Sequence, residues 1–360
     1  MDATLRHTAK VAPGAANLAL TEDGAANTVR FAVTEDLGGG LKAVADLGMR
    51  FGIADGNAQA AGARPLFQGE SRVGITGGFG TFKFGRGLTA LQLPNGGNSD
   101  PWGVRTNAGS VYAAGFASDY AAGGEGRIDG ALFYTSPSIN GLTLSVSMSP
   151  KKLTSVTAAA ATSTTQTAGG DPLVTAAVPG ITSTKTHQSI SAVYAAGPLV
   201  AGLGHEQNRV GDTITQVFGN YNMGVAKLFA SYATIEGGTA ADRAGVTFAA
   251  TASAVNSGSM APTAVGGVAA GGEIKNWTVG ATVPMGATTI LVGYSGWNGN
   301  GLVGQQDDTK FGIGAKYDLS KRTFLQASYA TQTRKNNTGT RPDRDNTKQN
   351  TIDLGIAHSF

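Results

Sequence analysis

The chain has 360 residues, a formal net charge of +3 and no cysteine. The absence of cysteine excludes a disulfide framework, a thiolate metal site and a cysteine nucleophile. Charged residues make up 14% of the chain, which excludes disorder driven by high net charge, and its 27 basic residues are spread along the chain rather than gathered into the patch typical of a nucleic-acid-binding protein.

Alternation of apolar and polar residues recurs along the whole chain, whereas helical periodicity and helix caps are almost absent. No strongly apolar run of about 18 residues or more occurs, so no transmembrane helix is predicted. In chain order, the clearest alternating segments are 41–51, 142–149, 310–317 and 351–360. They predict strands of about nine to eleven residues, the length that a tilted strand needs to cross a bilayer.

The connections between these strands fall into two classes that alternate along the chain. Short connections are predicted at 37–39, 78–80, 136–140, 197–198, 222–224, 284–286 and 320–321. Long connections are predicted at about 13–26, 53–68, 87–126, 150–187, 236–272, 298–307 and 334–349, and the short segment 209–211 is an exception at a long-class position. Short turns at one rim and long loops at the other are typical of a transmembrane barrel, and a soluble sandwich has no reason to sort its loops in this way.

The strand count gives the predicted architecture. About sixteen strands lie between these connections, an even number that places both termini at the short-turn rim and leaves no unpaired edge in lipid. The fold is therefore predicted to be all-β, a 16-stranded antiparallel transmembrane β-barrel wide enough for an aqueous channel, with residues 1–360 as one domain. Aromatic residues near the strand ends fit interfacial girdles, although aromatic residues are common in any strand.

Several motifs resemble those of Gram-negative general-diffusion porins, most of all the beta-proteobacterial branch. The segment 34–43 resembles that family's turn between the second and third strands, and 79–86 resembles the strand that leads into its constriction loop. The segments 127–137 and 317–323 resemble the following strand and the last short turn, and 358–360 resembles the family's terminal signal. The N-terminal segment 1–7 matches weakly.

The resemblance implies several expectations. The third loop, about 87–126, folds into the barrel as a constriction, and about 150–187 and 236–272 form long outer loops. The protein is expected to be an integral outer-membrane homotrimer in contact with lipid and lipopolysaccharide. Its C-terminal Phe360 would be read by the barrel-assembly machinery. No signal peptide follows Met1 in this sequence, which is compatible with removal of such a segment on export.

The parity of alternation predicts which side chains face the pore. We expect the constriction to be lined by basic residues, namely Arg30, Arg72, Lys83, Arg86 and Arg127, with acidic partners from the loop, namely Asp100, Asp119 and Glu125. Other charges expected on the lumen face are Lys42, Asp46, Arg50, Asp129, Lys316 and Arg322. Arg30 and Arg72 lie two residues beyond the places where the family carries arginine, so the basic ladder is expected at a shifted height. Any one of these residues could instead simply solvate a polar wall or pair with a neighbouring carboxylate.

These residues predict an outer-membrane pore for passive diffusion of small hydrophilic solutes and ions, weakly selective for anions because rings of Lys and Arg favour anions. Two alternatives remain open at this stage: a substrate-specific porin for organic acids or phosphate, and a structural or adhesive surface barrel. No enzymatic activity and no cofactor are predicted. The four histidines lack the spacing of a metal site.

Overall fold

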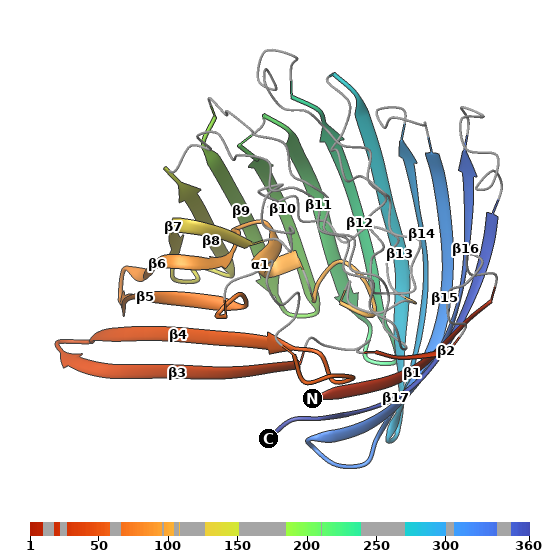
Figure 1. Cartoon of the computed structure of the whole chain (residues 1–360). Helices are drawn as coiled ribbons and strands as arrows, with labels where there is room; N and C mark the ends of the chain where they lie inside the picture. The colour runs from red at the N-terminus through yellow and green to blue at the C-terminus, as the bar shows by residue number, and fades with distance from the viewer. Residues whose placement is uncertain are drawn as a thin grey trace.

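A computed structural model of the chain describes residues 1–9, 18–21, 27–57, 66–95, 97–103, 108, 127–150, 185–209, 211–238, 271–299, 306–336 and 347–360. Within these residues, seventeen β-strands form one antiparallel sheet that curves into a wall, with its concave side toward the single short helix (Figure 1). No helix among the described residues is long and apolar enough to cross a membrane. The prediction of an all-β antiparallel barrel fold is confirmed, but the sheet does not close and has one strand more than predicted.

The strands follow one another around the sheet in chain order. They are β1 (Asp2–Ala9), β2 (Leu18–Thr21), β3 (Asn27–Gly38), β4 (Leu41–Phe51), β5 (Glu70–Gly77), β6 (Gly80–Leu88), β7 (Arg127–Thr135), β8 (Leu142–Ser149), β9 (His187–Ala196), β10 (Leu199–Gln207), β11 (Thr213–Asn222), β12 (Lys227–Glu236), β13 (Glu273–Met285), β14 (Thr288–Gly299), β15 (Gln306–Asp318), β16 (Thr323–Asn336) and β17 (Thr347–His358). The helix α1 (Gln92–Asn95) lies inside the loop that follows β6.

The two faces of the wall have the polarity of a membrane barrel rather than that of a soluble sheet. On β8, the outward side chains Leu142, Leu144, Val146 and Met148 are exposed, whereas Ser145, Ser147 and Ser149 are buried on the inner face. The outward tyrosines at positions 194, 221, 232, 294, 317 and 329 are also exposed. Alternation puts apolar residues on one face, and in this fold that face meets lipid while the polar face meets the interior.

The predicted sorting of connections is confirmed where the structure describes them. Neighbouring strands are joined by short turns after β3, β5, β7, β9, β11, β13 and β15, and the described part of the chain has the expected short exception between β10 and β11. At several of these turns a glycine adopts a left-handed conformation that other residues rarely reach, for example Gly286 with φ 64°. The turn residues therefore fix the pairing register of each hairpin.

The strand count differs from the predicted sixteen because of β2. This four-residue strand lies in a segment predicted as loop, and it pairs with β1 from Thr4–Thr21 to His7–Leu18. Its Leu-Ala-Leu-Thr sequence alternates large apolar with small side chains and pairs with the free edge of β1. In this structure the sheet is consequently open between β2 and β3. One contact near this opening is a pair of hydrogen bonds between Asp2 of β1 and Asn27 of β3.

The first and last strands are joined. β1 pairs with β17 in a continuous ladder from Asp2–Ala357 to Ala9–Asn350. On the inner face of this ladder, the Arg6 guanidinium donates to Asp353 through Nε at 2.8 Å and Nη2 at 3.0 Å, and both side chains are almost fully buried. The two ends of the chain thus lie together at the short-turn rim (Figure 1).

Candidate functional site

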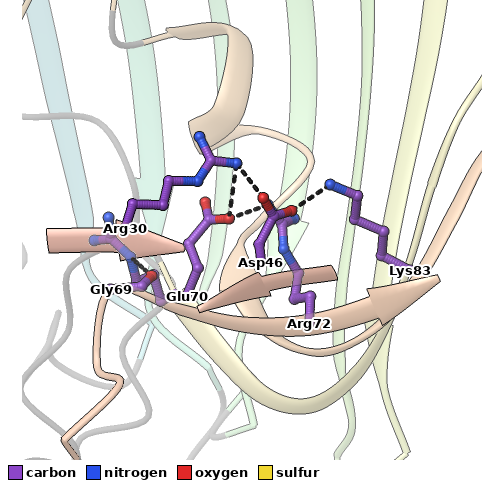
Figure 2. Close-up of polar contacts among 7 residues, drawn as sticks. Arg30, Asp46, Gly69, Glu70, Arg72 and Lys83 are labelled. Carbon is purple, nitrogen blue, oxygen red and sulfur yellow. Dashed lines mark hydrogen bonds and ion pairs between the residues drawn. The ribbon is translucent and has the colours of Figure 1, made fainter. Parts of the chain in front are cut away.

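A cluster of charged side chains occupies the inner face of four neighbouring strands. It consists of Arg30 from β3, Asp46 from β4, Glu70 and Arg72 from β5, and Lys83 from β6 (Figure 2). We call these five residues the inner charge cluster. Their opposite face carries Leu47, Val73 and Phe84, which are exposed on the outer side of the wall.

Strand register brings these residues together. Asp46 lies directly opposite Arg72, and Gly48 lies directly opposite Glu70. Arg72 lies opposite Gly85, and Gly87 leaves space for the arginine side chain, because a Cβ there would come within 2.7 Å of Arg72 Cδ. Directly opposed residues in antiparallel strands have Cβ atoms about 5 Å apart, so charges on adjacent strands of one face are held within reach of each other.

Each cation in the cluster has a carboxylate partner. Asp46 is the central acceptor: its Oδ2 accepts from Lys83 Nζ at 2.5 Å and its Oδ1 accepts from Arg30. Glu70 Oε2 accepts from Arg72 and lies 4.0 Å from Arg30 Nη2. Figure 2 shows these links as one continuous chain of contacts from Arg30 to Lys83.

The cluster retains one positive charge. It holds three cations and two carboxylates, so its sum is 3 − 2 = +1. The excess is presented to solvent mainly by Arg30, whose side chain is 53% exposed, whereas Arg72 is 8% and Lys83 20% exposed. Arg72 is held further by the ring of Phe133, whose centroid lies 5.2 Å from its guanidinium carbon. Arg30 is therefore the cation of this cluster most available to a passing ion.

Arg86 and Arg127 make further contacts beside the inner charge cluster. Arg86 donates from Nε to the carbonyl of Gln68 at 2.9 Å and pairs with Asp129. Arg127 donates from Nε to the carbonyl of Gly69 at 2.5 Å. A bulge at Gly85–Gly87 shifts the register of β6 against β7 beside these residues, a deviation from strict alternation that parity cannot predict.

The third loop lies along the inner wall, as the resemblance implies. Its first residues are buried: the amides of Ala90 and Leu91 each donate to a serine hydroxyl of the wall, Ser147 on β8 and Ser189 on β9, both at 2.9 Å. Ser191 on β9 donates back to the carbonyl of Ala90 at 2.7 Å. Serines on the inner face of β8 and β9 therefore satisfy the backbone polar groups of the loop, which burial would otherwise leave unpaired.

The next described part of the loop contacts the inner face of strands further along the sheet. Asn220 on β11 donates to Asn98 Oδ1 at 3.1 Å. Asp100, Pro101, Trp102 and Ala108 line one small crevice together with Thr278, Gly293, Tyr294 and Ser295 of β13 and β14. The described part of the loop thus contacts the inner face of strands from β8 to β14.

Among the acidic loop candidates, only Asp100 lies in the described part of the chain. It is buried and its carboxylate accepts a hydrogen bond from the backbone amide of Trp102 at 2.6 Å. Asp119 and Glu125 lie outside the described residues, as do most of the predicted outer loops at about 150–187 and 236–272.

The remaining predicted lumen charges are spread over the wall. Lys42 lies on the inner-face parity of β4 near the turn, and Arg50 accepts from Gln68 through its backbone carbonyl at 3.1 Å. Lys316 pairs with Asp318 at 2.9 Å close to the short-turn rim, and Arg322 lies in the last turn, lining a cavity there with both chain ends. These residues do not join the inner charge cluster.

Two features of the site escape sequence reasoning. The first is a buried pair on β9 and β10, in which His187 Nε2 lies 3.3 Å from Glu206 Oε1 and neither side chain is exposed. The spacing of the histidines gives no sign of it, although both residues occupy inner-face positions at the outer ends of paired strands. The second is a set of inner-face glycines beneath the third loop, namely Gly204, Gly280, Gly293 and Gly312.

Comparison with known proteins gives a consistent result. A protein-family model described as Gram-negative porin matches residues 1–337. The solved structure of an anion-selective porin from Comamonas acidovorans is similar with a TM-score of 0.73 at 21% identity, over 100% of this chain and 97% of that one. The outer-membrane protein OmpT of Vibrio cholerae is similar with a TM-score of 0.60 at 13% identity, over 100% and 95% of the two chains.

A variant of the Rh. blastica porin is also similar, with a TM-score of 0.57 at 12% identity, over 100% of this chain and 97% of that one. Comparison with curated proteins finds no match. At these identities the structural likenesses establish the fold, while the family match rests on the sequence itself.

Proposed function

The chain belongs to the Gram-negative porin family and is therefore an integral protein of the outer membrane, and we propose that it forms a passive diffusion pore that prefers anions. The solutes are small hydrophilic molecules and ions. A porin family consists of channels rather than enzymes, so we assign the chain no catalytic activity. The proposed constriction lies between the inner charge cluster and the third loop.

The observation that carries the proposal is the charge balance of the cluster. Its net charge of +1 is borne by an arginine that is about half exposed, on the inner face of the barrel. Low-dielectric walls concentrate the field of such a charge in the lumen. The printed description of the Comamonas acidovorans structure as anion-selective agrees with this reading but belongs to that protein.

The proposal is tested by the zero-current potential of the purified protein in a planar bilayer across a KCl gradient. We expect the sign that corresponds to chloride preference, with conductance that rises linearly with salt. A potential of the opposite sign would mean that acidic side chains dominate the pore. Saturation of the conductance by an organic acid or by phosphate would instead support a substrate-specific channel, and the absence of any conductance would refute the pore.

Replacing Asp46 with asparagine should strengthen the anion preference. The change removes one of two carboxylates, so the charge of the cluster rises from +1 to 3 − 1 = +2. Because Asp46 accepts from both Arg30 and Lys83, the two cations also lose their shared counter-charge and face the lumen more strongly. We expect the chloride-to-potassium permeability ratio to rise several-fold at low salt, where screening is weak.

The control for this change is Asp318→Asn, which removes a carboxylate from the rim pair with Lys316, away from the cluster. It should leave the permeability ratio nearly unchanged. An equal effect from both variants would show that overall charge, rather than the cluster, determines selectivity.

We also propose that the protein assembles as a homotrimer in lipid and lipopolysaccharide, as the resemblance to porins implies. Exposed apolar side chains on its outward face, such as Leu203, Val217 and Leu354, support the contact with lipid. The exposed C-terminal Phe360 is the proposed signal for the barrel-assembly machinery. Its ring lies in an edge-on contact with His358, with centroids 4.8 Å apart. Deletion of Phe360 should reduce the amount of folded protein in the outer membrane, measured as heat-modifiable protein in membrane fractions, without changing the conductance of the channels that do form.

A further inference from the structure

Four glycines on the inner face of the wall lie directly beneath the third loop. They are Gly204 on β10, Gly280 on β13, Gly293 on β14 and Gly312 on β15. The loop residues above them are, in the same order, Leu91, Pro101, Trp102 and Ala108. The contacts therefore begin where the loop first meets the wall and continue to the far side of its described course.

None of these positions needs glycine for its backbone conformation. Their φ angles are not positive, in contrast to turn glycines such as Gly286. What they lack is space. A Cβ atom on Gly280 would come within 2.5 Å of Pro101 Cγ, and one on Gly293 would come within 2.8 Å of Trp102 Cζ3. On Gly312 it would overlap the backbone of Ala108.

Gly293 and Gly312 are the most informative of the four. The three atoms nearest to a Cβ at each position all belong to the loop, namely the Trp102 ring at Gly293 and the Ala108 backbone at Gly312. At Gly280, by contrast, the neighbouring strand also contributes, through the carbonyl of Val292. A side chain at position 293 or 312 would therefore first collide with the loop.

We infer that these four glycines set the distance between the third loop and the barrel wall, and so determine the bore of the pore. The inference rests on the proposed function. The strands that carry these glycines, β10, β13, β14 and β15, are each hydrogen-bonded to a neighbour on both sides, so they cannot move outward to make room. Any side chain added beneath the loop must therefore move the loop toward the pore axis, where it reduces the open cross-section. Gly293 positions the loop through its contact with Trp102 and does not itself touch the solute.

The test compares Gly293→Ala with a matched control on the same strand. Gly296 lies three residues away on the outward face, and a Cβ there would come within 2.8 Å of the Trp277 ring on the neighbouring β13. Both substitutions thus add one methyl group to β14 against a tryptophan ring at the same distance. Only Gly293→Ala acts on the loop.

We expect Gly293→Ala to lower the single-channel conductance and the size limit for neutral polymers, and Gly296→Ala to leave both unchanged. Combining Gly293→Ala with Trp102→Ala removes the ring that the methyl group displaces, and should restore the conductance to the level of Trp102→Ala alone. Equal heat-modifiability of all variants on gels would establish that they fold alike.

Unchanged conductance and size limit in a folded Gly293→Ala variant would overturn the inference, as would equal losses from both glycine variants. If Gly293→Ala does not fold, Gly312→Ala provides the same comparison against Ala108. The zero-current potential of the unmodified protein is measured in the same bilayers. A wild-type pore with chloride preference and an ineffective Gly293→Ala would refute the role of the glycines and leave the proposed function standing, whereas a wild-type protein without conductance would refute both.

Discussion

Replacing Arg30 and Lys83 together with glutamine should reverse the preference of the pore from anions to cations. The inner charge cluster then holds one cation and two carboxylates, so its charge changes from +1 to 1 − 2 = −1. Asp46 loses both of the cations that its carboxylate accepts from, and its negative charge is left facing the lumen.

The size of the effect follows from Coulomb's law. A unit charge about 7 Å from a permeating ion contributes about 0.6 kcal/mol in bulk water and about 2.4 kcal/mol at an effective dielectric constant of 20. A change of two charges doubles these values, and about 1.4 kcal/mol corresponds to a tenfold ratio. We therefore expect the chloride-to-potassium permeability ratio to fall by about tenfold or more at low ionic strength.

The measurement is the zero-current potential across a KCl gradient, and the control removes two cations elsewhere. Lys42 shares the inner-face parity of Asp46 but lies four residues away, about 13 Å along the strand. The control is therefore compared at physiological salt, where the Debye length of about 8 Å is shorter than this separation. Lys321 lies in the last short turn. The variant with Lys42→Gln and Lys321→Gln should keep the chloride preference. Retention of that preference by the Arg30 and Lys83 variant would place the selectivity filter elsewhere.

Replacing Asp353 with asparagine should lower the free energy of unfolding of the barrel by about 3–5 kcal/mol, the usual cost of removing one partner from a buried ion pair. The reason is that the Arg6 guanidinium, whose side chain is 4% exposed, would remain buried without its carboxylate. The pair also joins the first strand to the last, so the loss weakens the ladder that holds β1. The measurement is the denaturant midpoint of the detergent-solubilised protein, followed by tryptophan fluorescence.

Two controls separate charge burial from general damage. Glu273→Gln removes a carboxylate from the exposed Glu273–Lys275 pair, and exposed pairs contribute little, so its midpoint should match the unmodified protein. The double variant with Arg6→Met and Asp353→Leu replaces the pair by apolar side chains and should recover most of the lost stability, because no unpaired charge remains. If Asp353→Asn unfolds at the native midpoint, the ion pair does not stabilise the closure of β1 on β17.

The architecture could be predicted from the sequence because its signals are periodic. The alternation of segments such as 142–149 fixes strand and face at once, and the two classes of connection fix topology. The strand β2 could not be predicted, because its four residues are too short a signal within a segment that otherwise has the features of a long connection.

The candidate site was predictable in part. Parity correctly brought Arg30, Arg72 and Lys83 to one face, where the structure joins them through Asp46 and Glu70. Their pairing was not predictable, since it depends on which strands are neighbours and on the reach of long side chains. Arg86 and Arg127 make their contacts beside a register shift at Gly85–Gly87, which alternation in the sequence does not reveal. The glycines beneath the loop have no signature in a single sequence, because a glycine that makes room for another segment looks like any other glycine.

The junction of β1 with β17 has a consequence for biosynthesis. The strand β1 is synthesised long before its partner β17, and the ladder between them joins residues as far apart in the sequence as Asp2 and Ala357. Phe360, the proposed signal for assembly, lies two residues after the end of β17. A chain that stops before β17 therefore lacks both the strand that pairs with β1 and the proposed assembly signal. We expect only chains that contain this segment to be inserted into the outer membrane.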